Sequence, residues 1–445
     1  MLKDISIYNP WYQNPNFLFP EKKFKKRRQF FLLNESLKKQ LILSLIGLRR
    51  TGKSTIIKQI INELLSQINP ENILFYEFDE KDINLEEILQ FYFKNILKQD
   101  LYSAKCFIFL DELQFILGWQ IILKKYFDIN PNIQFIISGS THLYLHKDTK
   151  ESLAGRIINI HLHPLSWYEF LELKHKKKYY LSENIFQDNF FENAKKNQDI
   201  LLYKEDLKTF LSFGEYPYFF HENNSIIMEK YYKEAILEKI FSKDINLFNV
   251  DMHKKFFNLF KVLNKDSAQE INIANIAREL EINTTTIKKY INILDKMFLY
   301  STISKHTNLR AQIKSFKKGY VTSLNLLRAT LGLDYWDIDN KQFGHIIETF
   351  VYNELVKNNT SFYEINFYHD SKIKKEVDFV LNKGQKIIPI EVKTTTNLLP
   401  KHLKNIQFFM EKYKLSRGYI FYGGDELIEE KISCGSVFYI PYFMI

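Results

Sequence analysis

Short, nearly continuous apolar runs alternate with segments of helical spacing between residues 38 and 165. Four of the runs are LILSLIGL, ILFYEFD, KCFIFLDE and IQFIISGS. Runs of this length without polar alternation are typical of strands that are buried on both faces of a parallel sheet. The segment TIIKQIINELLSQI, which follows the first run, carries the spacing of a helix. Strand and helix in alternation predict an α/β core built around a central parallel sheet.

The pattern divides the chain into five expected parts. A lead segment covers residues 1–35, and the α/β core covers 36–165. Strand-like runs disappear over residues 166–255, where segments such as MEKYYKEAILEKIFSKDI predict a helical subdomain. Residues 256–315 contain two helical patterns joined by a short turn and followed by a strand pattern. Residues 316–445 return to mixed α/β structure, so the fold class is a multidomain α/β protein.

The composition excludes several classes of protein but does not indicate a binding partner. Apolar residues make up 45% and aromatic residues 16% of the 445 residues, which excludes a disordered chain. Two cysteines, Cys106 and Cys434, exclude a disulfide framework and a zinc cluster. The sequence has neither a signal-peptide core nor an apolar segment of about 18 residues. We therefore expect a cytoplasmic protein with no membrane partner.

Positive charge is the second feature of the composition. The net charge of +10 fits a partner that carries phosphate groups, although the lysines are spread along the chain. The basic run EKKFKKRRQF at residues 21–30 has two interpretations. It forms either a solvated face, which we favour, or a phosphate-binding arm.

The segment GLRRTGKST at residues 47–55 satisfies the pattern G-x-x-x-x-G-K-[ST]. It lies between a predicted strand and a predicted helix, which is the context that a phosphate-binding loop requires. The alternative is an ordinary glycine-rich turn before a helix. In a phosphate loop the backbone N–H groups bind phosphates, Lys53 reaches the β- and γ-phosphates, and Ser54 ligates Mg²⁺. The predicted nucleotide-binding residues here are Gly47, Leu48, Arg49, Arg50, Thr51, Gly52, Lys53, Ser54 and Thr55.

Two adjacent carboxylates, Asp111 and Glu112, end the third apolar run. Carboxylates at the end of a buried strand are costly unless they manage a cation or a proton. We expect Asp111 to hold Mg²⁺ and Glu112 to orient or deprotonate the attacking water. The alternative is a strand that simply ends at an acidic turn.

Polar residues also follow the fourth run. Ser138 or Ser140 could contact the γ-phosphate or the attacking water, and Arg156 could stabilise transition-state charge in cis or from a neighbouring subunit. A role in trans would imply a homo-oligomer, whereas the alternative for Arg156 is an ordinary surface arginine. A guanine-binding N-K-x-D motif is absent from the sequence, which favours ATP over GTP.

The order of these segments resembles a family of prokaryotic P-loop ATPases in the AAA+ superfamily that carry a C-terminal domain of unknown function. The resemblance rests on the glycine loop and on FLDELQ, ISGSTHL, ESLAGR and HPLSWYEFLEL, and it covers nearly the whole chain. FGEYP at residues 213–217 is similar to the family's Gly-Gly-aromatic-Pro element, with Glu215 where a glycine is usual. The resemblance implies ATP binding but no physiological role.

Residues 271–304 have the pattern of a winged helix-turn-helix. Thr284 is the expected N-cap of the second helix, which would present Thr285, Thr286, Lys288 and Lys289 to solvent. In a DNA-binding protein this helix enters the major groove. Winged helices also serve as spacers or protein-binding modules, and two lysines supply little positive charge for binding in a DNA groove.

The segment KKEVDFVLNKGQKIIPIEVKTTT predicts a β-hairpin. If Lys383 and Gly384 form its turn, Asp378 pairs with Pro389. Glu391 and Lys393 then share a face with Asp378, and the two carboxylates become diagonal neighbours at about 7–8 Å. Carboxylates at that distance could share metal ions, with the lysine holding the attacking water or the scissile phosphate.

This arrangement resembles the PD-(D/E)xK motif of the restriction-endonuclease-like nuclease fold. The resemblance implies Glu348, in the preceding helix, as a third metal ligand beside Asp378 and Glu391, although Glu354 is an alternative. The family usually has an aspartate near Thr322, which this sequence lacks. An inactive nuclease fold therefore stays an alternative.

Two functions follow from the sequence. The first is an ATP-hydrolysing protein of the AAA+ type, using Mg²⁺, that is coupled to a DNA-associated winged helix and a nuclease-like C-terminal domain. The second is a nucleotide-driven switch that binds a protein partner through an inactive nuclease fold.

Overall fold

The computed structural model describes residues 2–78, 83–140, 153–176, 189–196, 198–222, 224–248, 250–335 and 337–445. Parts of three quoted segments lie outside these ranges: residue 79 of ILFYEFD, residues 141–143 of ISGSTHL and residues 151–152 of ESLAGR. The chain divides into two compact units, the first comprising Met1–His163 with Lys296–Phe298 and the second Pro164–Asp295 with Leu299–Ile445. No helix in the described ranges has both the length and the apolar character needed to cross a membrane.

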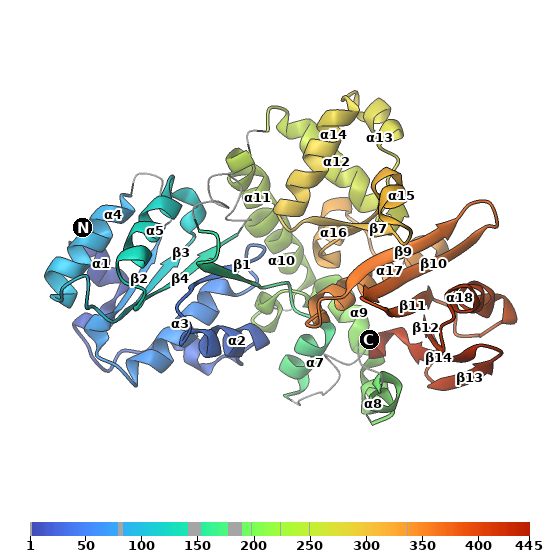
Figure 1. Ribbon diagram of the computed structural model, residues 1–445, viewed down its shortest axis with the longest axis horizontal. Helices are drawn as coiled ribbons and strands as arrows, with labels where there is room; N and C mark the ends of the chain where they lie inside the picture. Colours follow the sequence, from blue (N-terminus) through green and yellow to red (C-terminus); the bar gives the residue numbers. More distant parts are fainter. Residues whose placement is uncertain are drawn as a thin grey trace. The chain divides into compact units, whose positions relative to one another are not determined.

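Unit 1 contains a five-stranded sheet in the order β2-β3-β4-β1-β5, and every pair of neighbouring strands is parallel. The predicted α/β core with a parallel sheet is therefore confirmed (Figure 1). The edge strand β5 was not among the predicted runs, because it is largely exposed and carries no continuous apolar segment. The strands are β1 (Ile42–Ile46), β2 (Ile73–Glu77), β3 (Cys106–Asp111), β4 (Ile133–Gly139) and β5 (Ile157–His161).

Helices cover both faces of this sheet. They are α1 (Leu2–Tyr8), α2 (Arg28–Ser36), α3 (Lys53–Leu65), α4 (Leu85–Phe91) and α5 (Trp119–Ile129). On one face, Ile46 of β1 belongs to a buried cluster with Leu89 of α4 and Leu123 of α5. On the other face, Leu45 of β1 belongs to a cluster with Ile60 of α3. Neighbouring residues of a strand point to opposite faces, so a fully apolar β1 holds both layers together.

Unit 2 begins with helical structure. The described residues from Pro164 to Phe248 form helices and contain no strand. The α-helices here are α7 (Trp167–His175), α8 (Phe190–Lys196), α9 (Lys204–Thr209), α10 (Ser225–Lys230) and α11 (Lys239–Ser242). A capping box starts α7, in which the Ser166 hydroxyl accepts from the Glu169 backbone and the Glu169 carboxylate accepts from the Ser166 backbone.

A group of helices and three short strands follows. The elements are α12 (His253–Lys265), β6 (Gln269–Glu270), α13 (Ile273–Leu280), α14 (Thr284–Lys296), β7 (Tyr300–Lys305), α15 (Leu309–Lys314) and β8 (Lys318–Val321). Strand β8 lies between β6 and β7 and is antiparallel to both. Helix α14 is capped by Asn283, whose side chain accepts from the Thr286 backbone, and the expected cap Thr284 is instead the first helical residue.

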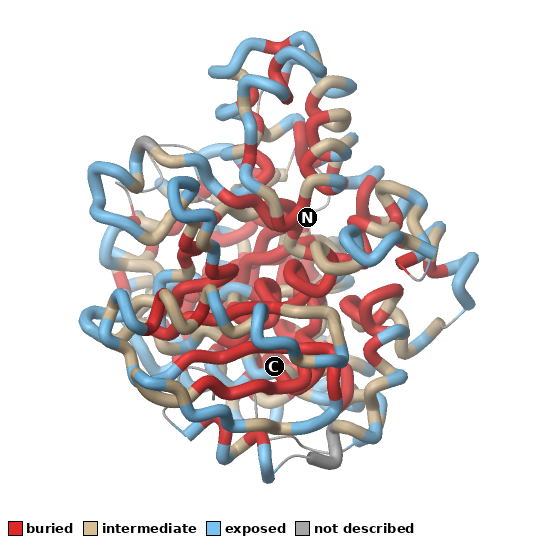
Figure 2. The backbone as a smooth tube through the Cα atoms, turned by 90° about the vertical axis from the view of Figure 1, so that its right-hand side faces the viewer, coloured by how far each residue is buried: buried red, intermediate tan, exposed pale blue. Residues whose placement is uncertain are grey.

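The rest of unit 2 extends the same sheet to nine strands, in the order β13-β14-β12-β11-β10-β9-β7-β8-β6. Its inner strands are buried, and Figure 2 shows such residues as continuous red stretches. The added elements are α16 (Leu324–Leu331), α17 (Asn340–Asn358), β9 (Glu364–Asp370), β10 (Lys375–Lys383), β11 (Lys386–Lys393), α18 (Pro400–Tyr413), β12 (Arg417–Tyr422), β13 (Ile428–Ile432) and β14 (Gly435–Pro441).

Candidate functional site

The glycine loop connects the end of β1 to the start of α3, as the sequence predicts. Gly47 has no room for a side chain, because a Cβ there would lie 2.1 Å from the carbonyl oxygen of Leu162. Gly52 has a φ of +101°, a backbone conformation that favours glycine. Both glycines of the motif are therefore required by the loop's own geometry.

Lys53 is almost fully buried at the first turn of α3. Its ammonium group donates to the carbonyl oxygens of Gly47 at 3.1 Å and Leu48 at 3.0 Å, so it lies inside the curve of the loop. The Thr51 hydroxyl also donates to Leu48, at 2.9 Å. Arg49 stacks against Phe115 with 5.9 Å between the guanidinium carbon and the ring centre.

Asp111 is the last residue of β3 and is completely buried. Burial and the charge of Glu112 raise the pKa of Asp111, while the hydroxyl groups of Ser138 and Ser54 oppose that rise. One carboxylate oxygen, Oδ1, accepts from the Ser138 hydroxyl and from the Glu112 backbone. Within the described residues the other oxygen, Oδ2, is buried without a hydrogen-bond partner. An oxygen in this state, beside a serine hydroxyl, fits a Mg²⁺ site.

Glu112 has a φ of +55°, so the chain turns sharply directly after β3. Its carboxylate accepts a hydrogen bond from the Gln114 side chain, which also donates to the Ser140 hydroxyl at 3.1 Å. The polar residues that follow β3 are therefore joined to the end of β4. Because parallel strands end at one edge of a sheet, these side chains and the glycine loop share that edge.

The predicted C-terminal hairpin forms with a different register. Gly384 and Gln385 make the turn, and Lys383 pairs with Lys386, so the predicted turn at Lys383 and Gly384 is wrong by one residue. Phe379 pairs with Ile390, which places Asp378 opposite Glu391 and not opposite Pro389. Directly opposed residues of antiparallel strands are closer than diagonal ones, about 4.5–5.5 Å between Cβ atoms.

The structure brings the predicted carboxylates together around an unpredicted lysine. Lys318 of β8 is almost fully buried, and its ammonium nitrogen lies 2.7 Å from Glu348 Oε1 and 3.9 Å from Asp378 Oδ1. Glu391 accepts from Lys393 at 2.6 Å. We name Lys318, Glu348, Asp378, Glu391 and Lys393 the C-terminal carboxylate cluster.

Burial governs the protonation of this cluster. It raises the pKa of Glu348 to about 7, with the charge of Lys318 opposing the rise. It raises the pKa of Glu391 to about 8, where the nearby charge of Asp378 adds to the rise and Lys393 opposes it. The pKa of Lys318 is itself raised, because attraction to Glu348 and Asp378 outweighs the lowering effect of burial.

The cluster does not fit the metal site that the sequence predicts. Across the described ranges, no group of three or more histidine, cysteine, aspartate or glutamate residues has an arrangement that could hold a metal ion. Each expected ligand already has a nitrogen partner: Glu348 has Lys318, Asp378 has the Val392 backbone at 2.8 Å, and Glu391 has Lys393. The residues are assembled as expected, and each has at least one oxygen bound by a donor of the protein. Glu391 Oε2 is buried without a hydrogen-bond partner among the described residues.

Comparison with known proteins finds a family model that matches the first part of the chain. A family model described as an AAA domain matches residues 39–171, which include the glycine loop, Asp111 and Glu112. We refer to residues 39–171 as the AAA domain, after the model that they match. Two models described as domains of unknown function match later segments, DUF8612 over residues 204–337 and DUF4143 over residues 343–443.

Two relatives align with most of the chain, and both are described as uncharacterized. An uncharacterized protein of Methanocaldococcus jannaschii is 29% identical over 98% of this chain and 92% of its own length. An uncharacterized protein of Haemophilus influenzae is 24% identical over 78% of this chain and 80% of its own length. A solved Walker-type ATPase of Pyrococcus abyssi aligns over 70% of this chain and 97% of its own, at 14% identity with a TM-score of 0.41.

Arg27 is a residue of the AAA domain's unit that sequence reasoning missed. Its guanidinium donates to the carbonyl oxygen of Thr51 in the glycine loop at 2.9 Å and to that of His163 at 3.1 Å. It belongs to the basic run for which a solvated face was the favoured interpretation. Nothing in the run's composition separates Arg27 from its basic neighbours, since the contact depends on how the lead segment folds back.

Arg156 lies at the far end of the AAA domain's sheet from the glycine loop. Its carbonyl oxygen accepts from the backbone of Ile42, the first residue of β1, whereas the loop follows Ile46, the last. The strand between them spans roughly 13 Å at about 3.3 Å per residue. The side chain pairs with Asp128, at 2.6 Å and 3.2 Å. This position does not support a catalytic role in cis, and a role in trans stays a prediction.

We expect Arg156→Ala to leave ATP turnover per chain within about twofold of wild type in dilute protein. The exposed ion pair with Asp128 contributes at most about 1 kcal/mol to stability. Phosphate release measured over a range of protein concentrations provides the check. A loss of turnover of a hundredfold that grows with protein concentration would instead place the arginine at a neighbouring subunit's nucleotide.

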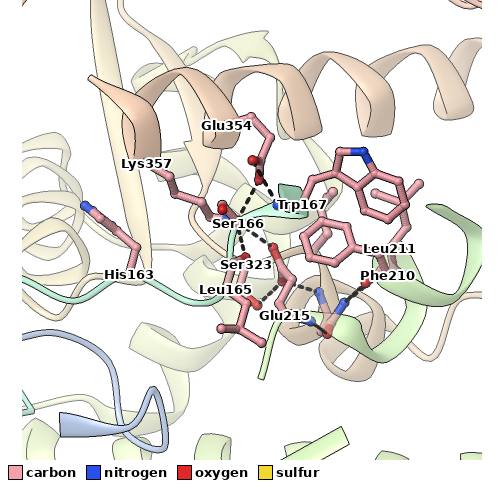
Figure 3. Close-up of polar contacts among 12 residues, drawn as sticks. His163, Leu165, Ser166, Trp167, Phe210, Leu211, Glu215, Ser323, Glu354 and Lys357 are labelled. Atoms are coloured by element: carbon pink, nitrogen blue, oxygen red, sulfur yellow. Dashed lines mark hydrogen bonds and ion pairs between the residues drawn. The ribbon is translucent and has the colours of Figure 1, made fainter. Parts of the chain in front are cut away.

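The two carboxylates of helix α17 that are candidates for the third metal ligand belong to different networks. Glu348 joins the C-terminal carboxylate cluster, whereas the alternative, Glu354, belongs to a second buried network. There Lys357 lies 3.1 Å from Glu354 and 3.5 Å from Glu215, and Glu354 accepts from the Trp167 backbone at 3.0 Å (Figure 3). The unusual Glu215 of FGEYP thus has a buried cationic partner.

Proposed function

We propose that this protein hydrolyses ATP at its AAA domain and uses the nucleotide cycle to act on DNA through unit 2. The observation that carries the hydrolytic part is the shared edge of the parallel sheet. Lys53 follows β1, whereas Asp111 ends β3 and Glu112 follows it. Ser138 of β4, the strand between these two, donates to the Asp111 carboxylate. A cation, a metal-binding carboxylate and a second acid at one edge are the groups that phosphoryl transfer needs.

Each residue has a distinct role in this proposal. The loop N–H groups and the Lys53 ammonium bind the phosphates, since that ammonium already lies within the loop's curve. Ser54 and Asp111 would hold Mg²⁺, which neutralises charge on the transferring phosphoryl group. Glu112 orients the attacking water and accepts its proton. Ser138 fixes the Asp111 carboxylate through its hydroxyl.

The DNA-associated part of the proposal rests on α13, α14 and the three strands β6, β7 and β8. Their order, with β8 antiparallel to both other strands, is consistent with a winged helix. Thr285, Lys288 and Lys289 of α14 are exposed, and Thr286 is half-buried. This helix face would contact the duplex, with two lysines placed for phosphates.

Glu112→Gln tests the hydrolytic role. We expect the variant to bind ATP within about threefold of wild type and to hydrolyse it at least about a hundredfold more slowly, because the amide keeps the size of the side chain but cannot accept a proton. Binding of a fluorescent ATP analogue and phosphate release measure the two steps. The matched control is Glu63→Gln on α3, where the carboxylate pairs with Lys26. Equal rates in both variants would contradict the assignment of Glu112.

A second candidate is a nucleotide-driven switch for a protein partner, in which the nuclease-like fold is inert. The observation in its favour is the lysine within the C-terminal carboxylate cluster. Duplex DNA separates the two functions. If the protein acts on DNA, saturating duplex should raise phosphate release severalfold, and Lys288→Glu with Lys289→Glu should remove that stimulation. An unchanged rate would favour the switch.

A further inference from the structure

The ammonium group of Lys318 is buried among carboxylates in unit 2. It has three carboxylate neighbours: Glu348 at 2.7 Å, Glu376 at 3.3 Å and Asp378 at 3.9 Å. Two of these, Glu348 and Asp378, are the carboxylates that the sequence assigns to a metal ion. A buried charge that touches several opposite charges is retained because removal of either partner leaves the other uncompensated.

Other donors bind the carboxylates of the cluster. The Tyr320 hydroxyl, also on β8, donates to Glu348 Oε1 at 2.8 Å, so the same oxygen has both a hydroxyl and an ammonium partner. Lys393 supplies a second ammonium to Glu391. A divalent ion that bound Glu348 and Asp378 would compete with Lys318 for those oxygens and would be repelled by its charge.

We propose that Lys318 is the resident cation of the C-terminal carboxylate cluster and takes the place of a divalent metal ion there. The lysine is part of strand β8, so its position is fixed by the fold and not by the metal concentration. The cluster then stabilises unit 2 around β8, β10, β11 and α17 without a metal ion, and it does not catalyse metal-dependent phosphodiester cleavage. Lys318 would hold this place whether or not the AAA domain hydrolyses ATP.

Titration with Mn²⁺ tests the proposal. The full-length chain would carry Asp111→Asn, which removes the carboxylate at the glycine loop, and nucleotide would be omitted. Free Mn²⁺ is followed by its electron paramagnetic resonance signal. We expect no bound Mn²⁺ at millimolar concentrations in this parent, and one Mn²⁺ per chain with at least about tenfold tighter binding after Lys318→Met.

Two further variants serve as controls for the titration. Lys318→Arg keeps the positive charge, so this variant, like the parent, should bind no Mn²⁺. Asp378→Asn in the Lys318→Met background should lose the gained site. The proposal is overturned if the parent binds one Mn²⁺ per chain and Asp378→Asn abolishes it, or if folded Lys318→Met gains no binding. If Lys318→Met does not fold, the parent and its Asp378→Asn variant decide alone, since an absence of bound Mn²⁺ in the parent supports the proposal.

Discussion

Lys53→Ala is expected to lower ATP turnover by at least about a hundredfold. The side chain is the cation nearest the loop carbonyls of Gly47 and Leu48, and alanine removes both hydrogen bonds together with the charge that would meet the phosphates. Loss of those two bonds also weakens the loop's own conformation. Steady-state phosphate release measures the first effect, and binding of a fluorescent ATP analogue measures how much of the loss lies in affinity.

The matched control is Lys58→Ala on the same helix. Lys58 pairs with Glu21 at 3.3 Å and lies away from the loop, so its removal should change turnover by less than about twofold. An unchanged rate of turnover in Lys53→Ala would remove the phosphate-loop assignment. A similar loss in both variants would show that α3 had been destabilised, and circular dichroism of each variant separates that case.

Local patterns in the sequence were enough for the core of unit 1. The four continuous apolar runs form β1, β2, β3 and β4. A strand that is buried on both faces is apolar at nearly every position, so its sequence differs clearly from the spaced apolar pattern of a helix. Strand β5 escaped prediction for the opposite reason, since only Ile160 among its residues is buried. The glycine loop was predictable because the geometry of such a loop requires glycine at fixed positions of the motif.

The C-terminal carboxylate cluster was only partly predictable. Residue types and the two-residue period of the hairpin placed Asp378 and Glu391 on one face, but either of two neighbouring turns was compatible with the sequence. Glu348 and Glu354 are both on α17, where every residue from Ile346 to Leu355 is buried, so periodicity could not choose between them. Lys318 is 30 residues from Glu348 and 60 from Asp378 in the sequence, and only the fold of unit 2 brings the three together.

The second buried network carries the other large expected effect. Lys357, Glu215 and Glu354 are all nearly inaccessible to solvent, and the Lys357 ammonium also donates to the Leu165 carbonyl oxygen at 3.0 Å. Burial alone would lower the pKa of Lys357, but attraction to Glu354 and Glu215 outweighs it and raises the pKa. The charged lysine therefore stabilises two buried carboxylates from different segments of unit 2.

We expect Lys357→Met to reduce the free energy of unfolding by about 3–5 kcal/mol, because methionine fills a similar volume but leaves Glu354 and Glu215 without their cation. Urea denaturation followed by intrinsic fluorescence measures the change. Lys233→Met is the surface control: its partner Glu229 is 2.9 Å away, but the lysine is about half exposed, so its loss should cost less than about 1 kcal/mol.

A third variant shows whether charge is the cause. If the uncompensated carboxylates destabilise Lys357→Met, adding Glu354→Gln should recover part of the lost stability, because the neutral amide can still accept from the Trp167 backbone. Additive losses in the double variant would instead mean that packing around Lys357, which also lies 5.6 Å from the centre of the Phe210 ring, is the larger contribution. The network would then be a packing feature in which the charges happen to be satisfied, and Glu215 would owe its position to its hydrogen bonds with Ser323 and Asn325.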